Sequence, residues 1–416
     1  MDLEAWEAAL RAAVLAAGAR ALEALLSGIG RGSRDIPLIC SCGNKMGSKG
    51  LREKTLLTIM GPAVYHRSMY ECPACGNIRY PGDEQLDVVD TTRTPGLRRM
   101  MARAGSTSTF KEAREDLKIY AGIEVSAKDV ERVAEGIGKD MKAWLEKEGG
   151  EAAGTSEEPV SILYISYDGT GVPMTKNELE GRKGKQPDGS AKTREVKLGC
   201  VFTQTSTDEK GRPVRDPEST TFTGAIESAD EFGWRIYGEA VRRGIGSAKR
   251  IVVLGDGATW IKNLANTHFP EATQIIDLYH AKEHVSNLCK ILFAGDEKQI
   301  LKHRIRWWTH LDYGQVEKIM HQAEKKLPGG HEAKKEALKE IAYLRKNKER
   351  MRYKDYRRKG LFVGSGVVEA GCKTVIGQRL KQSGMEWSVR GANAITALRC
   401  VIKSGRFEDY WGSRAA

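Results

Sequence analysis

The chain has 416 residues, too many for one ordinary domain, so about two to four units with at least one sizeable core are expected. Its 67 Lys and Arg residues outnumber its 55 Asp and Glu residues, and the formal charge of +12 favours a polyanionic partner, nucleic acid before anionic membrane. No run of 18 apolar residues occurs, which excludes a spanning helix and a membrane partner of that kind.

Residues 1–33 are predicted to form an N-terminal amphipathic helix that ends in the Gly-rich stretch GIGRGS. The segment begins acidic, and Arg11, Arg20 and Glu23 interrupt its apolar part, so it does not resemble a signal peptide. An Ala-rich helix is weak in isolation. It therefore packs either on its own domain or on a second copy of the protein.

Residues 34–90 are predicted to form a zinc ribbon. Two alternating strands, REKTLLTI and VYHRSMYE, are joined by a Gly-Pro turn and bracketed by the cysteine pairs CSCG and CPACG. Such knuckles hold a tetrahedral Zn²⁺ with four thiolates, here Cys40, Cys42, Cys72 and Cys75. The one-residue spacing of the first pair departs from the usual pattern and leaves His66 as a substitute ligand. The alternative is four reduced structural thiols; the other four cysteines are expected to be buried small residues.

Residues 91–148 are predicted to be helical, with segments LRRMMARAG, FKEAREDLKIYAG and SAKDVERVAEGIGKDMKAWLEK. Ser126 and Asp129 resemble a capping box, and the short turn before them gives helix-turn-helix spacing. DNA would then be contacted by Ser126, Lys128 and Arg132. An ordinary αα-hairpin remains the alternative. A linker is predicted at residues 149–159, which lack apolar periodicity.

Residues 160–292 predict strands and helices in the order β-β-β-α-β-α-β-α. This is the ribonuclease H order, an α/β fold in which the first and fourth strands are neighbours at the sheet centre. The first strand is expected to end at Asp168, the fourth at Asp256 and the fifth at Asp277. Because a ligand crevice forms at the carboxyl ends of such strands, Asp168 and Asp256 should lie side by side.

A basic, all-helical insertion is predicted at residues 293–360, before the core resumes at residues 361–416 with its C-terminal helices. The insertion ends in a dense Lys/Arg run interleaved with Tyr343, Tyr353 and Tyr356. Such a run is either a solvated helix face or a nucleic-acid contact. Across the core and insertion, the candidate DNA contacts are Arg182, Lys183, Lys185, Arg345, Lys346, Arg350, Arg352, Arg357, Arg358, Lys373, Arg379 and Lys381.

Three acids form the candidate catalytic set: Asp168, Asp256 and Glu369, the last on a helix after the insertion. Two divalent cations, Mg²⁺ or Mn²⁺, need such a cluster, since one acid bridges both ions and the others each hold one. The ions would activate water or a DNA 3′-hydroxyl and stabilise the leaving oxygen.

Several motifs carry a resemblance. They are D-G-T-G at Asp168, G-D-G-A-x-W-I at Asp256, D-L-Y-H at Asp277, and G-S-G-x-V-E…R-L-K-x-S-G-M-x-W-S ending at Ser388. Together they resemble the Mutator-like superfamily of DDE transposases, more narrowly the ISKra-type transposases of bacterial insertion sequences. The resemblance implies an enzyme that binds terminal inverted repeats, cleaves phosphodiesters and joins ends to target DNA. The three acids match that family's catalytic acids.

The same resemblance implies further expectations. Asp277 and His280 match a signature that either supports the active site or is structural, and Trp387 matches an aromatic residue that either lies in the core or stacks on a base. Double-stranded DNA, a homodimer or larger assembly, and a bacterial cytoplasmic, nucleoid-associated location are expected. The alternatives are a structure-specific nuclease with the same fold and a catalytically silent zinc-ribbon regulator.

Overall fold

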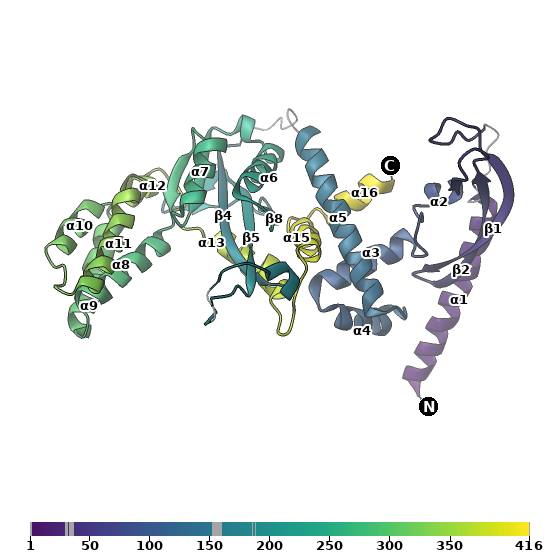
Figure 1. Cartoon of the computed structure of the whole chain (residues 1–416), viewed down its shortest axis with the longest axis horizontal. Coiled ribbons are helices and arrows are strands. Elements are labelled where there is room, and N and C mark those ends of the chain that lie inside the picture. The colour runs from purple at the N-terminus through teal and green to yellow at the C-terminus, as the bar shows by residue number, and fades with distance from the viewer. Residues whose placement is uncertain are drawn as a thin grey trace. The chain divides into compact units, whose positions relative to one another are not determined.

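The computed structural model describes residues 2–29, 32, 37–151, 160–184, 186–187 and 189–415. They form a mixed α/β protein that divides into two compact units, Met1–Ile137 and Gly138–Ala416 (Figure 1). The division falls inside a long helix that continues to Glu151, past the predicted start of the linker. Residues 152–159 of that linker lie outside the described residues.

The first unit contains a small antiparallel sheet, a long helix beside it and a helical group. Its elements are α1 (Leu3–Ile29), β1 (Gly47–Thr58), β2 (Gly61–Glu71), β3 (Ile78–Arg79), α2 (Pro81–Gln85), α3 (Pro95–Thr107), α4 (Phe110–Ala121) and the first part of α5 (Ala127–Glu151). The sheet order is β1-β2-β3. The hairpin turns at Gly61, whose φ of +115° favours glycine. The two predicted strands and their turn are confirmed.

The three predicted helical segments of this unit are also helices. Thr109 begins α4 with a complete capping box to Glu112. At the start of α5, the Ser126 hydroxyl accepts a hydrogen bond from the Asp129 amide at 3.0 Å, as expected of a cap. The Asp129 carboxylate forms an ion pair with Arg93 at 2.7 Å. The start of α5 is therefore fixed both by its own cap and by the loop before α3.

The second unit is built on a five-stranded sheet of order β10-β9-β4-β5-β8. Its strands are β4 (Ile162–Pro173), β5 (Thr193–Gln204), β8 (Thr221–Ala225), β9 (Arg250–Gly255) and β10 (Thr273–Ile276); β6 (Ser206–Thr207) and β7 (Pro213–Val214) form a separate pair. β4 is antiparallel to β5 and parallel to β9. The first and fourth strands of the sheet are thus central neighbours, as the sequence predicts.

β4 continues beyond its predicted end at Asp168. Its parallel pairing with β9 stops at Ser166, but its antiparallel pairing with β5 runs on to Pro173. Gly169 lies in this extension, where an added Cβ would come within 2.3 Å of the Glu195 side chain. The prediction of a strand end at Asp168 is wrong, because the hairpin ladder continues after the parallel neighbour has ended.

The helices of this unit cover both faces of the sheet. They are α6 (Ala229–Arg242), α7 (Thr259–His268), α8 (Leu278–Leu292), α9 (Glu297–Asp312), α10 (Val316–Glu324), α11 (His331–Asn347), α12 (Tyr353–Arg358), α13 (Gly366–Gly371), α14 (Gln378–Leu380), α15 (Val389–Lys403) and α16 (Phe407–Ala415), with a π-helical segment, Cys372–Gly377, after α13. Leu163, Ile165 and Tyr167 of β4 share a core with α6 and α7. Tyr164 belongs to a second core with α8. Side chains alternate between the two faces along a strand. Asp168, four residues after Tyr164, therefore lies on the same face as Tyr164, that of the second core.

Residues 293–360 form helices α9 to α12, grouped beside α8 (Figure 1). Their buried residues belong to the same core as those of β4, β5, β9 and β10. The segment is all-helical, as predicted, and its buried side chains are continuous with the core that borders the sheet. Tyr353 and Tyr356 are 0% and 7% exposed. These tyrosines pack inward, which corrects their assignment to a nucleic-acid surface.

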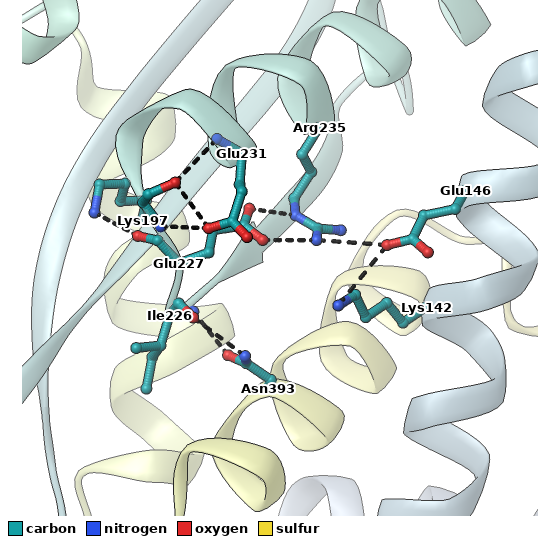
Figure 2. Close-up of polar contacts among 9 residues, drawn as sticks. Lys142, Glu146, Lys197, Ile226, Glu227, Glu231, Arg235 and Asn393 are labelled. Carbon is teal, nitrogen blue, oxygen red and sulfur yellow. Dashed lines mark hydrogen bonds and ion pairs between the residues drawn. The ribbon is translucent and has the colours of Figure 1, made fainter. Parts of the chain in front are cut away.

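Polar contacts tie the start of α6 to α5 and α15 (Figure 2). Arg235 pairs with Glu227 at 2.6 Å and with Glu146 of α5 at 3.6 Å. Asn393 of α15 accepts a hydrogen bond from the Ile226 amide at 2.7 Å and donates one to the Ile226 carbonyl. The outer edge of the sheet is thus fixed by side chains from three helices.

Candidate functional site

The four clustered cysteines meet at the open end of the β1–β2 hairpin. The Sγ atoms of Cys40, Cys42, Cys72 and Cys75 all lie within 4.8 Å of one another. In the described part of the chain, no other group of three or more His, Cys, Asp and Glu side chains brings its ligand atoms together in this way. The group can hold a metal ion such as zinc.

Both cysteine pairs sit on tight turns, in which the hydrogen-bonded residues are three positions apart at the first pair and four at the second. The Gly43 amide donates to the Cys40 carbonyl and the Gly76 amide to the Cys72 carbonyl, each at 2.9 Å. Both glycines have positive φ, +85° and +69°. The one-residue spacing of the first pair is therefore compatible with a knuckle. The substitute ligand His66 lies instead beside Glu53, 48% exposed.

The electrostatics of this group suit a cation. The backbone amide of Cys42 lowers the pKa of the Cys40 thiol to about 6, although burial opposes this. The pKa of Cys75 is raised to about 12: the Asn77 amide lowers it, but the other three sulfurs outweigh that effect. Four thiolates repel one another, and a bound cation would relieve that repulsion.

The two strand acids lie at matching positions on the central strands of the second unit. The parallel pairing of β4 and β9 ends with Ser166 opposite Leu254, and Asp168 and Asp256 each follow two residues later. Both are half-buried. Burial raises the pKa of Asp168, and a hydrogen bond from the Gly169 amide partly lowers it again. The negative charges of Asp256 and Glu369 raise the pKa further. All three acids therefore share one electrostatic environment.

Asp277 holds the segment that carries Glu369. Its carboxylate is 1% exposed. Oδ1 accepts a hydrogen bond from the His280 amide at 2.6 Å and so caps α8. Oδ2 accepts from both the amide and the hydroxyl of Ser365, the latter at 3.0 Å. The Ser365 hydroxyl also lies 3.1 Å from Glu369 Oε1. Asp277 is thus joined to Glu369 through one serine.

Cys372 contacts the catalytic candidate Asp168 directly. Its Sγ lies 3.7 Å from Asp168 Oδ2 and donates to it. Burial and the charge of Asp168 raise the pKa of this thiol to about 12. The residue opens the π-helical segment, a feature that is frequent at functional sites. The sequence predicts only a buried small residue here, but a position three after Glu369 lies on the same helix face.

Tyr343 of α11 holds the loop that carries Asp256. Its hydroxyl donates to the Asp256 carbonyl at 2.7 Å. An added Cβ at Gly257 would come within 2.9 Å of the same hydroxyl, and the φ of Gly257 is +89°. The ring stacks on His284 at 3.6 Å between centroids, and His284 Nδ1 lies 2.6 Å from Glu340 Oε2. No local sequence signal marks Tyr343, since α11 and β9 meet only in the fold.

The three acids are each engaged by local hydrogen bonds. Asp168 accepts from the Gly169 amide, Asp256 accepts from the Ala258 amide at 2.8 Å, and Glu369 shares the one proton of the Ser365 hydroxyl with Asp277. Their oxygens are not gathered as tightly as the four sulfurs are, within the residues that the structure describes. Carboxylates alone are nevertheless the donor set that Mg²⁺ prefers.

Most of the predicted DNA contacts are exposed, and several are already paired. Ser126, Lys128, Arg132, Arg182, Lys183, Lys373 and Lys381 are exposed; Lys185 lies outside the described residues. Exposed Lys346 donates to Thr259 at 2.9 Å. The remaining basic residues have partners as follows: Arg345 with Glu324, Arg350 with Asn347, Arg352 with Glu349, Arg357 with Asp312 and Arg358 with Asp355.

Arg379 and Trp387 are core residues. Arg379 is 0% exposed, and its guanidinium lies 5.0 Å from the centroid of the Trp387 ring. Trp387 is 6% exposed and donates to the Leu380 carbonyl at 3.1 Å. The assignment of Arg379 to a DNA contact is therefore corrected, and of the two roles left open for Trp387 the core role is the one observed. His280 is half-buried beside His284, at 4.9 Å between rings.

Comparisons with known proteins find similarity to an uncharacterised family. Residues 227–411 match the model of the uncharacterised protein family UPF0236. Three UPF0236 proteins of Caldanaerobacter subterraneus subsp. tengcongensis are 22%, 22% and 23% identical over 87% of this chain, covering 70%, 67% and 70% of their own lengths. Each of the three names combines several locus designations of that organism: four in the first, two in the second and eleven in the third.

One solved structure, the Drosophila P element transposase strand transfer complex, aligns with a TM-score of 0.26 and 10% identity, over 76% of this chain and 80% of that one. A similarity this low does not establish a shared fold. Separately, no helix in the described ranges is long and apolar enough to cross a membrane.

Proposed function

We propose that the chain is a DDE-type DNA transposase whose second unit is a ribonuclease H-like catalytic core. One observation carries the proposal. The parallel pairing of β4 and β9 ends with Ser166 opposite Leu254, and Asp168 and Asp256 each lie two residues beyond that end. Glu369 adds its charge to the same environment. A cluster of three acids at the carboxyl edge of an α/β sheet can hold the two metal ions that catalyse phosphoryl transfer.

The residues fit a divalent cation in donor chemistry and in charge. Asp168, Asp256 and Glu369 supply only oxygen ligands, and the repulsion that raises the pKa of Asp168 is what a cation would relieve. Bound Mg²⁺ or Mn²⁺ would activate a nucleophile and stabilise the leaving oxygen of a displacement at phosphorus.

The chain's other residues would position these acids. Tyr343 holds the Asp256 loop, and the Asp277–Ser365 contact holds the start of the helix that carries Glu369. Lys381 donates to Thr170 beside Asp168, and Lys373 lies exposed on the segment after Glu369. These two lysines are suited to bind the phosphates that flank a scissile bond.

The first unit would bind DNA. Its zinc-ribbon hairpin and the exposed Ser126, Lys128 and Arg132 of the helix-turn-helix-like region are the proposed contacts to terminal inverted repeats. A protein encoded at many positions of one genome is what a self-copying element leaves behind. The names of the relatives, which join up to eleven locus designations, therefore support mobility.

The test is cleavage and joining of terminal-repeat DNA, taken from the sequence that flanks the gene, in Mg²⁺. The Asp256→Ala variant should lose both reactions while its affinity for the repeat stays within about twofold. Asp355→Ala, which removes an exposed acid paired with Arg358, is the matched control and should remain active. Full activity of Asp256→Ala would refute the proposal. Cleavage without joining would favour a structure-specific nuclease, and repeat binding without either reaction would favour a silent regulator.

A further inference from the structure

One face of α1 carries an exposed apolar stripe. Its seven members are Leu3, Trp6, Leu10, Val14, Ala17, Ala21 and Leu25. These positions repeat every 11 residues. Because that spacing nearly matches three full turns of an α-helix, the stripe runs almost parallel to the helix axis. The five large residues are all 60–68% exposed, and the charged residue at the edge of the stripe is Glu7. From Leu3 to Leu25 the stripe is about 33 Å long at 1.5 Å per residue.

α1 packs within its own unit through other side chains. Leu26 is buried in a cluster with Leu56 and Tyr65, and the Glu23 carboxylate accepts a hydrogen bond from the Val64 amide of β2. A cleft between α1 and the hairpin turn is lined by other α1 residues, none of them in the stripe. The unit therefore folds without covering the stripe, and an exposed apolar surface of this extent typically marks an interface.

When two α1 helices run antiparallel, large side chains of one stripe face small side chains of the other. The N-terminal half of the stripe has large side chains, Leu3, Trp6 and Leu10, whereas Ala17 and Ala21 make its C-terminal half small. An antiparallel pair centred on Val14 places Leu3 opposite Leu25 and, to within one residue along the helix, Leu10 opposite Ala17 and Trp6 opposite Ala21. Large residues then fill the space above small ones at the Leu10–Ala17 and Trp6–Ala21 contacts, while Val14 packs on Val14 at the centre and Leu3 on Leu25 at each end. A parallel pair would oppose Trp6 to Trp6 and leave gaps at the alanines.

We infer that α1 is a homodimerisation helix that pairs antiparallel with α1 of a second copy of this chain, around a two-fold axis at Val14. A two-fold axis requires each surface to complement itself, and the reversed size pattern of the stripe meets that requirement. The inference rests on the first unit alone and holds whether or not the second unit transposes DNA.

The first test is the mass of the full chain in solution by light scattering. The protein should have twice the mass of the 46.0 kDa chain. The double variant Trp6→Glu and Leu10→Glu should have the mass of one chain with unchanged helical circular dichroism. Ala9→Glu, at an exposed position of α1 outside the stripe, should remain dimeric. A single-chain mass for the unaltered protein at 50 μM, or a dimer of the double variant, would overturn the inference.

The second test distinguishes the antiparallel pair from any other contact. Chains with Leu3→Cys and with Leu25→Cys, carrying tags of different size, are mixed in the zinc-loaded state and treated with a short bifunctional maleimide. Crosslinks should join Leu3→Cys to Leu25→Cys chains, at least fivefold above an Ala9→Cys control. Predominant linkage of Leu3→Cys chains to each other would contradict the antiparallel arrangement, as would linkage no greater than in unaltered protein.

Discussion

Asp277 Oδ2 accepts two hydrogen bonds from Ser365, one from its backbone amide and one from its hydroxyl. The sequence separation of these residues is large, because helices α8 to α12 lie between them. The contact therefore closes the chain back onto the sheet at the point where α13 begins. It gives the D-x-x-H motif a physical role: its acid caps α8 and anchors the Glu369 helix, while His280 supplies the capped amide.

Replacing Asp277 by Ala should destabilise the protein, because it leaves the amides of His280 and Ser365 without their acceptor. Hydrogen bonds to a buried charged group contribute about 1.5–3 kcal/mol, so the free energy of unfolding should fall by at least that amount. Urea denaturation measures it. Asp355→Ala, an exposed acid, should change it by less than about 0.5 kcal/mol. Equal stabilities of the two variants would show that the contact does not hold the fold.

Replacing Tyr343 by Phe should impair the proposed reaction more than it impairs folding. The variant loses only the hydrogen bond to the Asp256 carbonyl, which is worth about 1 kcal/mol of stability. Because the Asp256 loop is then less well held, kcat should fall about tenfold or more with little change in KM. Tyr313→Phe, at a residue 55% exposed, is the control. If Tyr343→Phe retained full kcat, Tyr343 would be a structural residue only.

The cysteine group should bind one zinc ion per chain. Atomic absorption after dialysis should find about one zinc in the unaltered protein and in His66→Ala, but less than half of that in Cys72→Ser. Since the hairpin has little core of its own, chelation should expose residues 37–90 to hydrogen exchange and leave the second unit protected. Full zinc in Cys72→Ser would show that the four sulfurs are not the ligands.

Exposed and buried basic residues should respond differently to substitution. Lys373→Ala and Lys381→Ala should each weaken DNA binding and lower the salt slope of log Kd by about one, because each removes a phosphate contact. Arg379→Met should reduce stability, since it removes a buried cation beside Trp387, and should leave the salt slope unchanged. Titrations of fluorescent DNA at several salt concentrations measure the slopes. A reduced slope for Arg379→Met would contradict its placement in the core.

The strands and most helices are predictable from local patterns. The apolar run before Asp256 and the alternation in the β1–β2 hairpin identify strands because burial imposes those patterns directly. Their order also predicts that β4 and β9 are neighbours. The extension of β4 past Asp168 is not predictable in this way, because it depends on pairing with β5 through a glycine-containing segment.

The surroundings of the acids depend on contacts that local patterns do not encode. Tyr343 reaches Asp256 from a helix 87 positions later, and Cys372 reaches Asp168 across 204 positions. The tyrosines of the basic run illustrate a related point: a helix that packs on a core keeps its charges outside and its tyrosines inside, so aromatic residues within a basic run do not by themselves mark a binding surface.

The central claim, that Asp168, Asp256 and Glu369 form one site for divalent cations, is tested most directly by Mn²⁺ titration calorimetry of the full protein bound to terminal-repeat DNA, with the cysteine group loaded with zinc. The account predicts about two Mn²⁺ per chain, and loss of at least one in each of Asp168→Asn, Asp256→Asn and Glu369→Gln, with Asp355→Asn unchanged. Unaltered Mn²⁺ binding in all three variants would contradict it.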